Sequence, residues 1–583
     1  MLGECLEVFG GYTEEEREGL VFNHYIPKDG TYVLVGVNGE IVSKTDIKLD
    51  RKTGMVNKSS PRYHDFCFYD YHSDLVSMNK PQDALKIIHS NNYLSFWVKK
   101  ESILNGKLTM DVIDGYYDVL EHPEKKYKKD VRAASLYGML EAELGPVNAE
   151  LLHKNKRWVR EHIFSMEDLG ADIDMGKKDY LKIFFEAEKE EYKREGKRYF
   201  IPNIYNSNQY NVVIEGETYG LPDNNQGMNA KKPFLSIKTR KCVAPYLLDR
   251  ESVMLQKQFF DYLMTFAAAG KYNVYVDLEH GRFIPCGNGD YPTGEVCGFF
   301  LRIQKGKEVE IHEQDVVPYF RNELQKPFVY RNLLGIEDTE NPEYEGVREC
   351  ITCQEVERMI NDVFFSKALV NHYFSPEENI KIADETVKRM LLLSRRKLFG
   401  WLHLGNTADL ESLFHKVFME LIKNSIAKEY MRKAAKQLNM KWSLEGYLEE
   451  GGNGMADFSL ELREGLKEKI VAEEYKGLEN DREYYFAVGQ MARYLVVLSK
   501  AGKKKQSLIN PFLNARTDKK LKELLGRYYK RYNYDILLGA KKVDRLYGMV
   551  EGYEPESPIM QDLLCAGFVI DNLLLEKKAK EET

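Results

Sequence analysis

The sequence has no run of about 18 consecutive apolar residues, the length that a membrane-spanning helix needs. Its first residues, Met1 to Cys5, show neither the basic segment nor the apolar run of a signal peptide. Cysteine is sparse as well, because 8 residues in a chain of 583 do not form a disulfide framework. These absences argue against a membrane protein and against a disulfide-rich secreted domain, and they favour a cytoplasmic protein with reduced thiols.

Motifs of the common catalytic classes are also missing. The sequence has no phosphate-binding Gly-Lys-Ser/Thr loop, no Gly-x-Ser-x-Gly elbow and no His-Glu-x-x-His. We therefore expect no enzymatic activity and no cofactor. The alternative is a metal-dependent nuclease that uses Asp65 and Asp70, because these two and Asp74 lie close together and could hold Mg²⁺.

A zinc site is a further alternative. Cys350 and Cys353 have the spacing of a zinc knuckle, and Cys286 and Cys297 flank a Gly-rich turn upstream. The upstream pair is separated by 10 residues, however, and the other pair stands at the start of an expected helix. Buried thiols are therefore the favoured interpretation, and we expect no metal.

Charge is distributed unevenly along this acidic chain. The net charge is −7, yet the segment from Arg493 to Arg545 holds 15 Lys and Arg against 4 Asp and Glu, a local balance of +11. Such segregation indicates a surface that faces a polyanion, whereas the alternative is a solvated lysine-rich helix face. The candidate contacts to a DNA backbone are Lys503, Lys504, Lys505, Arg516, Lys519, Lys520, Arg527, Lys530, Arg531, Lys541 and Lys542.

One helix of this basic segment has a predicted buried face. Apolar residues recur there at helical spacing, as Leu521, Leu524, Leu525, Tyr528 and Tyr532. The neighbouring Lys and Arg are then expected to be exposed. Tyr529 and Tyr534 are candidates for stacking on unpaired bases, although structural tyrosines are the commoner case.

The N-terminal part of the chain reads as mixed α and β. With 43% hydrophobic residues the chain can form a sizeable core, and its length is typical of about three to five domains. Strand patterns occur at 31–37, 40–49, 64–71, 93–99, 272–276 and 296–303. The first two flank Asn38-Gly39, a strong signal for a β-hairpin. Helical patterns occur at 116–195, with a break at Gly145-Pro146, and at 245–269.

After about residue 354 the helical period continues to the C-terminus. Helices are expected at 376–404, 409–439, 458–475, 481–500, 518–532 and 559–575. Ser375-Pro376-Glu377-Glu378 has the cap, the proline and the acidic first turn of a helix start. We therefore expect an α+β fold, in which a mixed N-terminal domain at 1–355, with antiparallel strands and helical insertions, precedes an all-helical domain at 356–583.

A polar segment between Leu221 and Pro245 suits contact with nucleic acid. Asn224, Asn225 and Asn229 can present amides to base edges or phosphates. A set of cations can neutralise a backbone, namely Lys231, Lys232, Lys238, Arg240 and Lys241. The alternative is a surface loop with turn-forming Asn and Gly.

Several segments, in this order along most of the chain, resemble one family: the large subunit of the type I-B CRISPR surveillance complex (Cascade), subtype b of the eighth Cas family. They are Asp70-Tyr71-His72-Ser73-Asp74-Leu75 with Asn79-Lys80-Pro81, His89-Ser90-Asn91-Asn92-Tyr93-Leu94-Ser95-Phe96, Met228-Asn229-Ala230-Lys231-Lys232-Pro233-Phe234-Leu235 with Lys238-Thr239-Arg240-Lys241, Tyr484-Tyr485-Phe486-Ala487-Val488-Gly489-Gln490 with Tyr494-Leu495, and Lys530-Arg531-Tyr532-Asn533-Tyr534.

The resemblance implies a non-catalytic subunit of an RNA-guided complex. In such systems guide RNA pairing reads the target, while the protein recognises a short protospacer-adjacent motif in duplex DNA. The large subunit also helps to open the duplex and recruits a helicase-nuclease. The implied partners are guide RNA, target double-stranded DNA, the backbone and guide-end subunits, a small subunit and the helicase-nuclease, with no membrane.

The resemblance also assigns roles to the two parts of the chain. Motif recognition falls to the N-terminal domain, with Asn91, Asn92 and the residues from Asn224 to Lys241 as candidates. An Asn amide suits A·T pairs, because it can bond adenine N6 and N7 in the major groove. The C-terminal bundle is expected to lie along the target or displaced strand.

A second product is expected from the region around Met455. This residue follows Glu449-Glu450-Gly451-Gly452-Asn453-Gly454, whose codons can spell a purine-rich ribosome-binding sequence. The resemblance implies a small subunit made from an internal start in the same gene. Translation from Met455 would then release residues 455–583 with the basic segment, whereas the alternative is an ordinary Gly-rich linker between helices.

Overall fold

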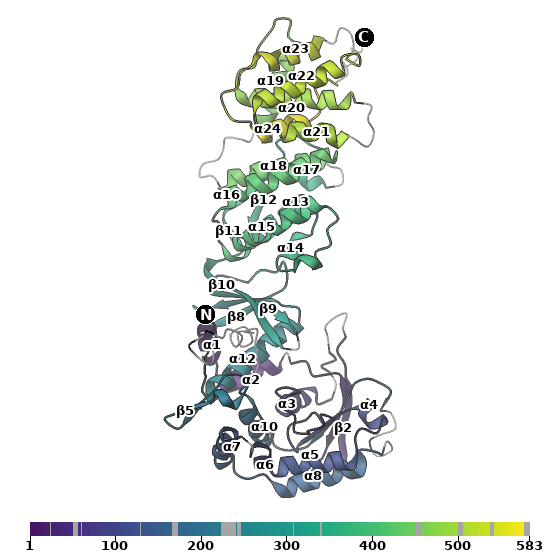
Figure 1. The fold of residues 1–583 in the computed structure, drawn as a ribbon, viewed down its shortest axis with the longest axis vertical. Helices are drawn as coiled ribbons and strands as arrows, with labels where there is room; N and C mark the ends of the chain where they lie inside the picture. Colours follow the sequence, from purple (N-terminus) through teal and green to yellow (C-terminus); the bar gives the residue numbers. More distant parts are fainter. Residues whose placement is uncertain are drawn as a thin grey trace. The chain divides into compact units, whose positions relative to one another are not determined.

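The computed structural model describes the whole chain except residues 24, 51–55, 60, 129, 166–168, 170–172, 223–238, 240, 242–245, 307, 338–340, 449–457, 500–504, 537–540 and 576–583. Helix accounts for about 52% and strand for about 16%, with small sheets in the N-terminal half and helices in the C-terminal part. The predicted α+β class is therefore confirmed. Figure 1 shows the elements and their labels.

Two compact units make up the chain, fewer than its length suggests. The N-terminal unit comprises Met1–Gly287 and Cys297–Val316, and the C-terminal unit comprises Asn288–Val296 and Val317–Thr583. The boundary expected at residue 355 lies instead near Val317. The reason is that the strands between these positions, β11 (Glu323–Arg331) and β12 (Val347–Thr352), pair with each other and pack on C-terminal helices.

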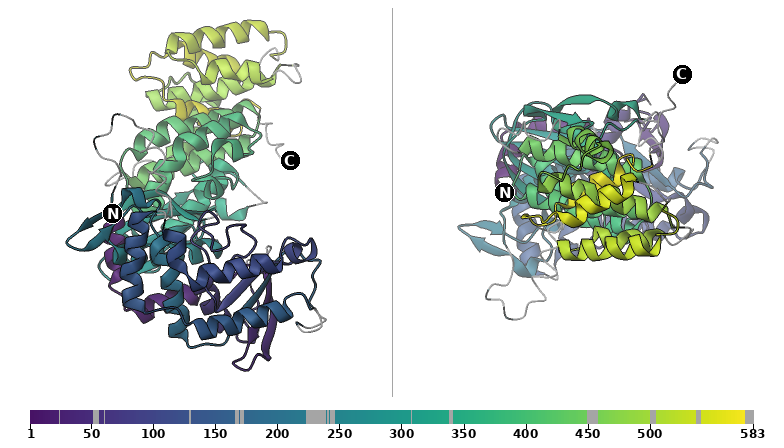
Figure 2. Two further views of the ribbon diagram at one scale, coloured as in Figure 1. Left: turned by 60° about the horizontal axis from the view of Figure 1, so that its bottom comes forward. Right: turned by 90° about the horizontal axis from the view of Figure 1, so that it is seen from above.

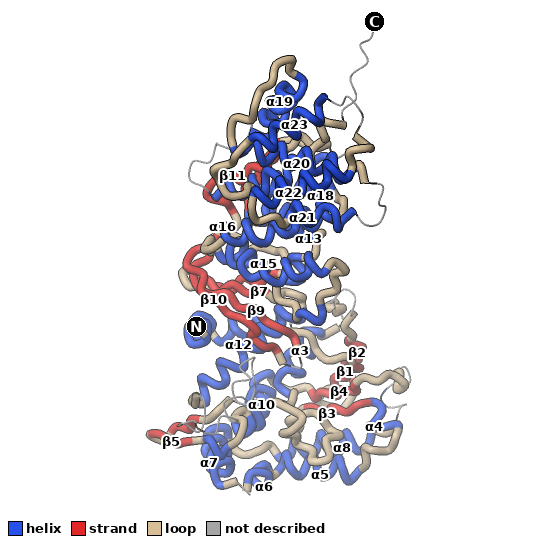
Figure 3. The backbone as a smooth tube through the Cα atoms, turned by 45° about the horizontal axis from the view of Figure 1, so that its top comes forward, coloured by secondary structure: helices blue, strands red, loops and turns tan. Residues whose placement is uncertain are grey.

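The first sheet of the N-terminal unit has the strand order β2-β1-β4-β3 (Figure 3). Its strands are β1 (Gly30–Val35), β2 (Ile41–Ile47), β3 (Ser95–Lys99) and β4 (Tyr180–Phe185). The predicted hairpin of β1 and β2 is confirmed, and Gly39 in its turn has φ +91°, where glycine is favoured. β4 pairs in parallel with β1, although the sequence predicts helix there, since a short buried apolar run fits either structure.

The strand predicted at 64–71 is wrong, because this segment forms the helix α3 (Tyr63–Ser73). Its fully buried positions include the adjacent Phe66 and Cys67, then Asp70 three or four residues later and Ser73 three residues after that, the spacing of one helix face. Because Asp70 and Ser73 are polar, the pattern of apolar residues alone does not show the helical period. The aromatic content of the segment then favours a strand by propensity, and tertiary burial overrides that preference.

The other helices of the N-terminal unit surround this sheet and a second one. Their bounds are α1 (Leu2–Gly10), α2 (Glu14–Phe22), α4 (Lys100–Leu104), α5 (Met110–Glu121), α6 (Pro123–Tyr127), α7 (Val131–Leu144), α8 (Ala149–His162), α10 (Lys189–Asn203) and α12 (Arg250–Ala268). The expected helical stretch 116–195 is thus several helices interrupted by β4. α12 begins after its N-cap Asp249, later than the pattern at 245 suggests.

The second sheet has the strand order β10-β9-β7-β8. Its strands are β7 (Asn273–Asp277), β8 (Arg282–Cys286), β9 (Val296–Lys305) and β10 (Val309–Phe320). β7 and β9 confirm the strands predicted at 272–276 and 296–303. β10 is an edge strand of this sheet and contains Pro318. Proline has no backbone N–H to donate to a neighbouring strand, so it is tolerated at a sheet edge. A separate hairpin joins β5 (Val212–Ile214) and β6 (Glu217–Tyr219).

Helices dominate the C-terminal unit. Its strands β11 and β12 precede residue 356, so the described residues of the predicted helical domain 356–583 contain no strand. Its helices are α13 (Cys353–Phe365), α14 (Leu369–His372), α15 (Glu385–Leu404), α16 (Leu410–Leu413), a π-helical segment (Phe414–Phe418), α17 (Met419–Ala427), α18 (Met431–Leu448), α19 (Phe458–Val471), α20 (Asp481–Val497), α21 (Lys505–Leu513), α22 (Asp518–Arg531), α23 (Lys541–Gly552) and α24 (Gln561–Val569). The start predicted at Ser375-Pro376 is wrong. Those residues lead into a short 3₁₀ turn (Glu377–Asn379), and α15 begins after its N-cap Asp384.

Helix α20 is the centre of the last part of the chain, where helices pack side by side (Figure 2). Tyr484, Phe486 and Leu495 of α20 are fully buried. One hydrophobic cluster joins α20 to α21, α22, α23 and α24 and extends to α17 and α18. The segment 455–583 therefore shares its core with earlier helices, and its predicted start Met455 lies outside the described residues.

Candidate nucleic-acid interface

Helix α22 presents cations on one side and buries the other. Its buried residues are Leu521, Leu524, Leu525 and Tyr528, and Tyr532 is buried directly after the helix. This confirms the predicted apolar stripe. Thr517 caps the helix by accepting a hydrogen bond from the backbone N–H of Lys520. The exposed residues include Lys519, Lys520, Arg527, Lys530 and Arg531. Apolar burial thus fixes the orientation that leaves these cations in solvent.

Two tyrosines near the end of α22 have different surroundings. Tyr529 donates a hydrogen bond of 2.6 Å to Asp544, and its ring stacks on that of Tyr547 with 4.2 Å between centroids. Tyr534, in contrast, is 98% exposed. Of the two candidates for base stacking, Tyr529 is therefore held by the protein, and Tyr534 is accessible.

Three cations of the basic segment serve the fold. Arg493 donates hydrogen bonds to the carbonyls of Phe568, Val569 and Ile570, at the C-terminal end of α24. Arg545 bonds backbone carbonyls just after α19, and Lys522 contacts Asp518 and Glu554. A cation at a helix C-terminus satisfies carbonyls that have no partner within the helix. These residues explain part of the local charge without a ligand.

The remaining cations that were predicted to contact a DNA backbone differ in their exposure. Arg516 and Lys541 are exposed, and Lys542 is half-buried. Lys505 is the first residue of α21, whereas Lys503 and Lys504 lie outside the described residues. The cations whose exposure the structure describes therefore centre on α22.

Asn91 and Asn92 are not available to DNA bases, which corrects the expected role of both. Their exposed fractions are 1% and 2%. The Asn91 amide donates to the carbonyls of His72 and Asp74, at 3.1 and 2.6 Å, and the Asn92 amide donates to Ser73 and Asn91. Both side chains thus tie this loop to the C-terminal end of α3. A sequence does not reveal that an Asn-rich loop turns inward in this way.

Most of the other motif-reading candidates fall in the part of the chain that the structure does not describe. Asn224, Asn225, Asn229, Lys231, Lys232, Lys238 and Arg240 lie outside the described residues. Lys241 is described and exposed. Its role in motif recognition stays a prediction.

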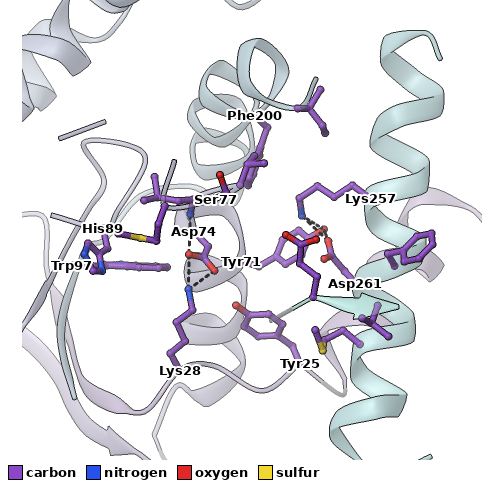
Figure 4. A pocket seen from close by; sticks show the side chains of 18 of the residues that line it. Tyr25, Lys28, Tyr71, Asp74, Ser77, His89, Trp97, Phe200, Lys257 and Asp261 are labelled. Carbon is purple, nitrogen blue, oxygen red and sulfur yellow. Dashed lines mark hydrogen bonds and ion pairs between the residues drawn. The ribbon is translucent and has the colours of Figure 1, made fainter. Parts of the chain in front are cut away.

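A cavity of about 680 Å³ lies in the N-terminal unit, beside the loop that follows α3. Lys28 pairs with Asp74, Nζ to Oδ2 at 2.7 Å, and Lys257 pairs with Asp261 at 2.6 Å. The two ion pairs lie on either side of Tyr25 and Tyr71 (Figure 4). Although burial opposes it, Asp74 raises the pKa of Lys28 above its usual value. No sequence motif joins these residues, because the fold brings them from distant segments.

The carboxylates proposed for a nuclease do not form a metal site. Asp70 is fully buried and contacts the Lys182 ammonium, and it accepts hydrogen bonds from Tyr25 and Tyr32. Asp65 pairs with Arg62 at 2.9 Å. Among the residues that the structure describes, no group of three or more His, Cys, Asp or Glu is placed to hold a metal ion. The geometry that this alternative requires is therefore contradicted.

The four cysteines of the zinc alternative are not gathered either. Cys286, Cys350 and Cys353 are buried, and Cys297 is exposed. Among the described residues, no group of three or more possible metal ligands includes any of them. Burial raises the pKa of the Cys353 thiol to about 12, which disfavours the thiolate that zinc binds. Buried thiols, the favoured interpretation, are what the structure shows at three of the four positions.

Some of the segments that carry the family resemblance lie close to one another in the structure. Asp70 to Leu75, Asn79 to Pro81 and His89 to Phe96 meet beside the cavity, where Asp74, Asn79 and His89 contribute to its wall. Tyr484 to Gln490 forms the buried core of α20. Comparisons with protein-family models, with curated proteins and with solved structures find no match to this chain. Within the described part of the chain, no helix is long and apolar enough to cross a membrane.

Proposed function

We propose that the chain is a non-catalytic, nucleic-acid-binding large subunit of an RNA-guided CRISPR interference complex that works in the cytoplasm. The observation that carries the binding role is Tyr534, which is 98% exposed and closely follows the exposed Lys530 and Arg531 of α22. Proteins hold single-stranded nucleic acid by combining cations for the phosphates with aromatic rings on which bases stack. This end of α22 offers both.

The wider role rests on the ordered family resemblance. In this proposal guide RNA pairs with the target, and the large subunit contacts double-stranded DNA, recognises an adjacent motif and helps to separate the strands. Its partners are the backbone and guide-end subunits, a small subunit and a helicase-nuclease. Genes for those subunits are then expected beside the gene for this chain.

Motif recognition is assigned to the residues from Asn224 to Lys241, and Asn91 and Asn92 leave the proposal. Amide and guanidinium groups of that segment can bond base edges, and its lysines can bond phosphates. Of the cations in that segment, the structure describes Lys241, and its exposure suits such contact.

The test compares two exposed tyrosines of the C-terminal unit. Tyr534→Ala is expected to weaken single-stranded DNA binding by the full chain by about 1–3 kcal/mol, the contribution of one stacked base. Tyr475→Ala is the matched control, because Tyr475 is 64% exposed and lies outside the basic segment. Equal affinities of the two variants would contradict a strand-binding role for this end of α22.

A further inference from the structure

The cavity beside α3 has the size and lining of a small-molecule site. Its volume of about 680 Å³ falls in the range of known ligand pockets, about 300–1,000 Å³. Aromatic side chains from several separate elements line it, among them Tyr25, Tyr71, Trp97, Tyr180 and Phe200. A flat ring can be held among such side chains by stacking and by apolar contact.

The charges on the cavity wall indicate what kind of group enters it. Among the lining residues that the structure describes, two lysines, Lys28 and Lys257, accompany three carboxylates, Asp74, Asp261 and Glu308. Both lysines already pair with a carboxylate. The wall therefore has no excess of positive charge for a phosphate. It does offer ammonium donors and carboxylate acceptors to a neutral, polar ring, and a nucleobase is such a ring.

A second cavity, of about 300 Å³, is also lined by the loop that contains Asn79. Asn79 lines both cavities, so the two adjoin. Lys80 and Lys126 line the second, and the carboxylate described there, Asp130, caps α7 by accepting from the backbone N–H groups of Arg132 and Ala133. This cavity therefore has an excess of positive charge.

The two lysines are held in place by neutral groups. Lys126 donates to the carbonyl of Pro81 at 2.8 Å and to Gln82 Oε1 at 2.7 Å, and Lys80 donates to the carbonyl of Asn203. Burial, followed by the charge of Lys80, lowers the pKa of Lys126 to about 7. An anion beside both lysines would relieve this repulsion, as a phosphate does in many protein sites.

We propose that the two cavities together bind one nucleotide, with its base in the larger cavity and its phosphate beside Lys80 and Lys126 in the smaller. The nucleotide is either free in solution or an unstacked nucleotide of a nucleic-acid strand, since both present the same chemistry. The site lies in the N-terminal unit and does not use α22.

The first experiment titrates the full chain with AMP, GMP, CMP and UMP, with the corresponding nucleosides and with inorganic phosphate, in a calorimeter. At least one nucleotide is expected to bind more tightly than its nucleoside and than phosphate. Lys126→Met, which keeps the aliphatic stem, should weaken the nucleotide about tenfold and leave the nucleoside unchanged. Lys28→Ala should weaken both, and the exposed Lys107→Ala is the control that changes neither.

The outcomes separate the proposal from simpler alternatives. If phosphate binds as tightly as the nucleotides and Lys28→Ala has no effect, the smaller cavity is an anion site and the proposal is wrong. It is also wrong if neither mononucleotides nor a short oligonucleotide bind at millimolar concentration in a chain whose melting curve is normal.

A competition experiment then identifies the source of the nucleotide. Displacement of the bound mononucleotide by a short single-stranded oligonucleotide, but not by the same strand with abasic sites, supports an unstacked base of a strand. Failure of both oligonucleotides to compete supports a free nucleotide. The double variant Arg527→Ala/Lys530→Ala should bind mononucleotides normally, so failure of the strand-binding role of α22 remains distinguishable from failure of this inference.

Discussion

Gly489 of α20 and Gly567 of α24 bring the backbones of these two helices into direct contact. A Cβ atom on Gly489 would lie 2.2 Å from the carbonyl oxygen of Leu564, and one on Gly567 would lie 2.1 Å from that of Phe486. The neighbouring Gln490 donates a 2.6 Å hydrogen bond to the Gly567 carbonyl. The two glycines thus permit the closest packing at the centre of the C-terminal core.

Gly489→Ala should therefore lower the free energy of unfolding of the C-terminal unit by about 2–3 kcal/mol, because a methyl group must push two backbones apart. The matched control is Gly465→Ala in α19, where the added Cβ meets nothing within 4 Å. There alanine should be neutral or stabilise the helix by up to about 1 kcal/mol. Urea unfolding of both variants measures the difference, and equal stabilities would show that α20 and α24 do not pack in this way.

The buried ion pair of Lys182 and Asp70 makes a second prediction. Both side chains are fully buried. Lys182→Met should cost about 3–5 kcal/mol, because it leaves the Asp70 carboxylate buried without a counter-ion. The double variant Lys182→Met/Asp70→Leu should cost less than the sum of the two single changes. If urea unfolding shows that the losses in the free energy of unfolding of the two single variants add up in the double variant, the ion pair is contradicted.

Acid should destabilise the N-terminal unit through His72. Burial, followed by the charges of nearby lysines, lowers the pKa of His72 from 6.5 to about 3. The folded pKa is depressed, so below pH 6.5 the unfolded chain binds a proton that the folded chain does not. This contribution to stability is present above that pH and is lost as the pH falls toward the folded value, by at most about 1.4 kcal/mol per pH unit.

The measurement is the difference in the free energy of unfolding between His72→Phe and the unchanged chain, from pH 7 to pH 5. It should shift in favour of the variant as the pH falls, because phenylalanine cannot take up the proton. A difference for His72→Phe that does not change with pH would contradict the assigned environment.

A shorter product beginning at Met455 is the fourth prediction. If the codons before Met455 form a ribosome-binding sequence, expression of the intact gene should yield residues 455–583 in addition to the full chain. Intact-mass spectrometry should detect that product, and synonymous recoding of Glu450-Gly451-Gly452 should remove it without changing the full-length protein. Its absence before recoding would leave this segment as an ordinary connection between helices.

The predictions that the structure confirms rest on patterns of residues that are close together in the sequence. The β1–β2 hairpin follows from two strand patterns around Asn38-Gly39, and all residues that define the turn are adjacent in sequence. The stripe of α22 was visible because every buried position in it is apolar or aromatic. Where the buried positions include polar side chains, as with Asp70 and Ser73 in α3, the same method gives the wrong element.

Long-range contacts limited what could be predicted for the sites. The burial of Asn91 depends on carbonyls at the end of α3, which lie 17 and 19 residues earlier in the chain. Lys257 and Asp261 of α12 line the larger cavity and contact Phe200 and Tyr71, respectively, which lie far from them in sequence. The held ring of Tyr529 likewise depends on Asp544 and Tyr547 of another helix.

The most direct test of strand binding by α22 is the salt dependence of single-stranded DNA affinity for the full chain. Arg527→Ala/Lys530→Ala should weaken binding and reduce the magnitude of the slope of log K against log salt by about 1.4, the value for two phosphate contacts on a single strand. The control, Lys381→Ala/Arg389→Ala, removes two exposed cations of the same unit outside the basic segment and should leave the slope unchanged. Equal slopes and equal affinities for the two double variants would contradict the proposal.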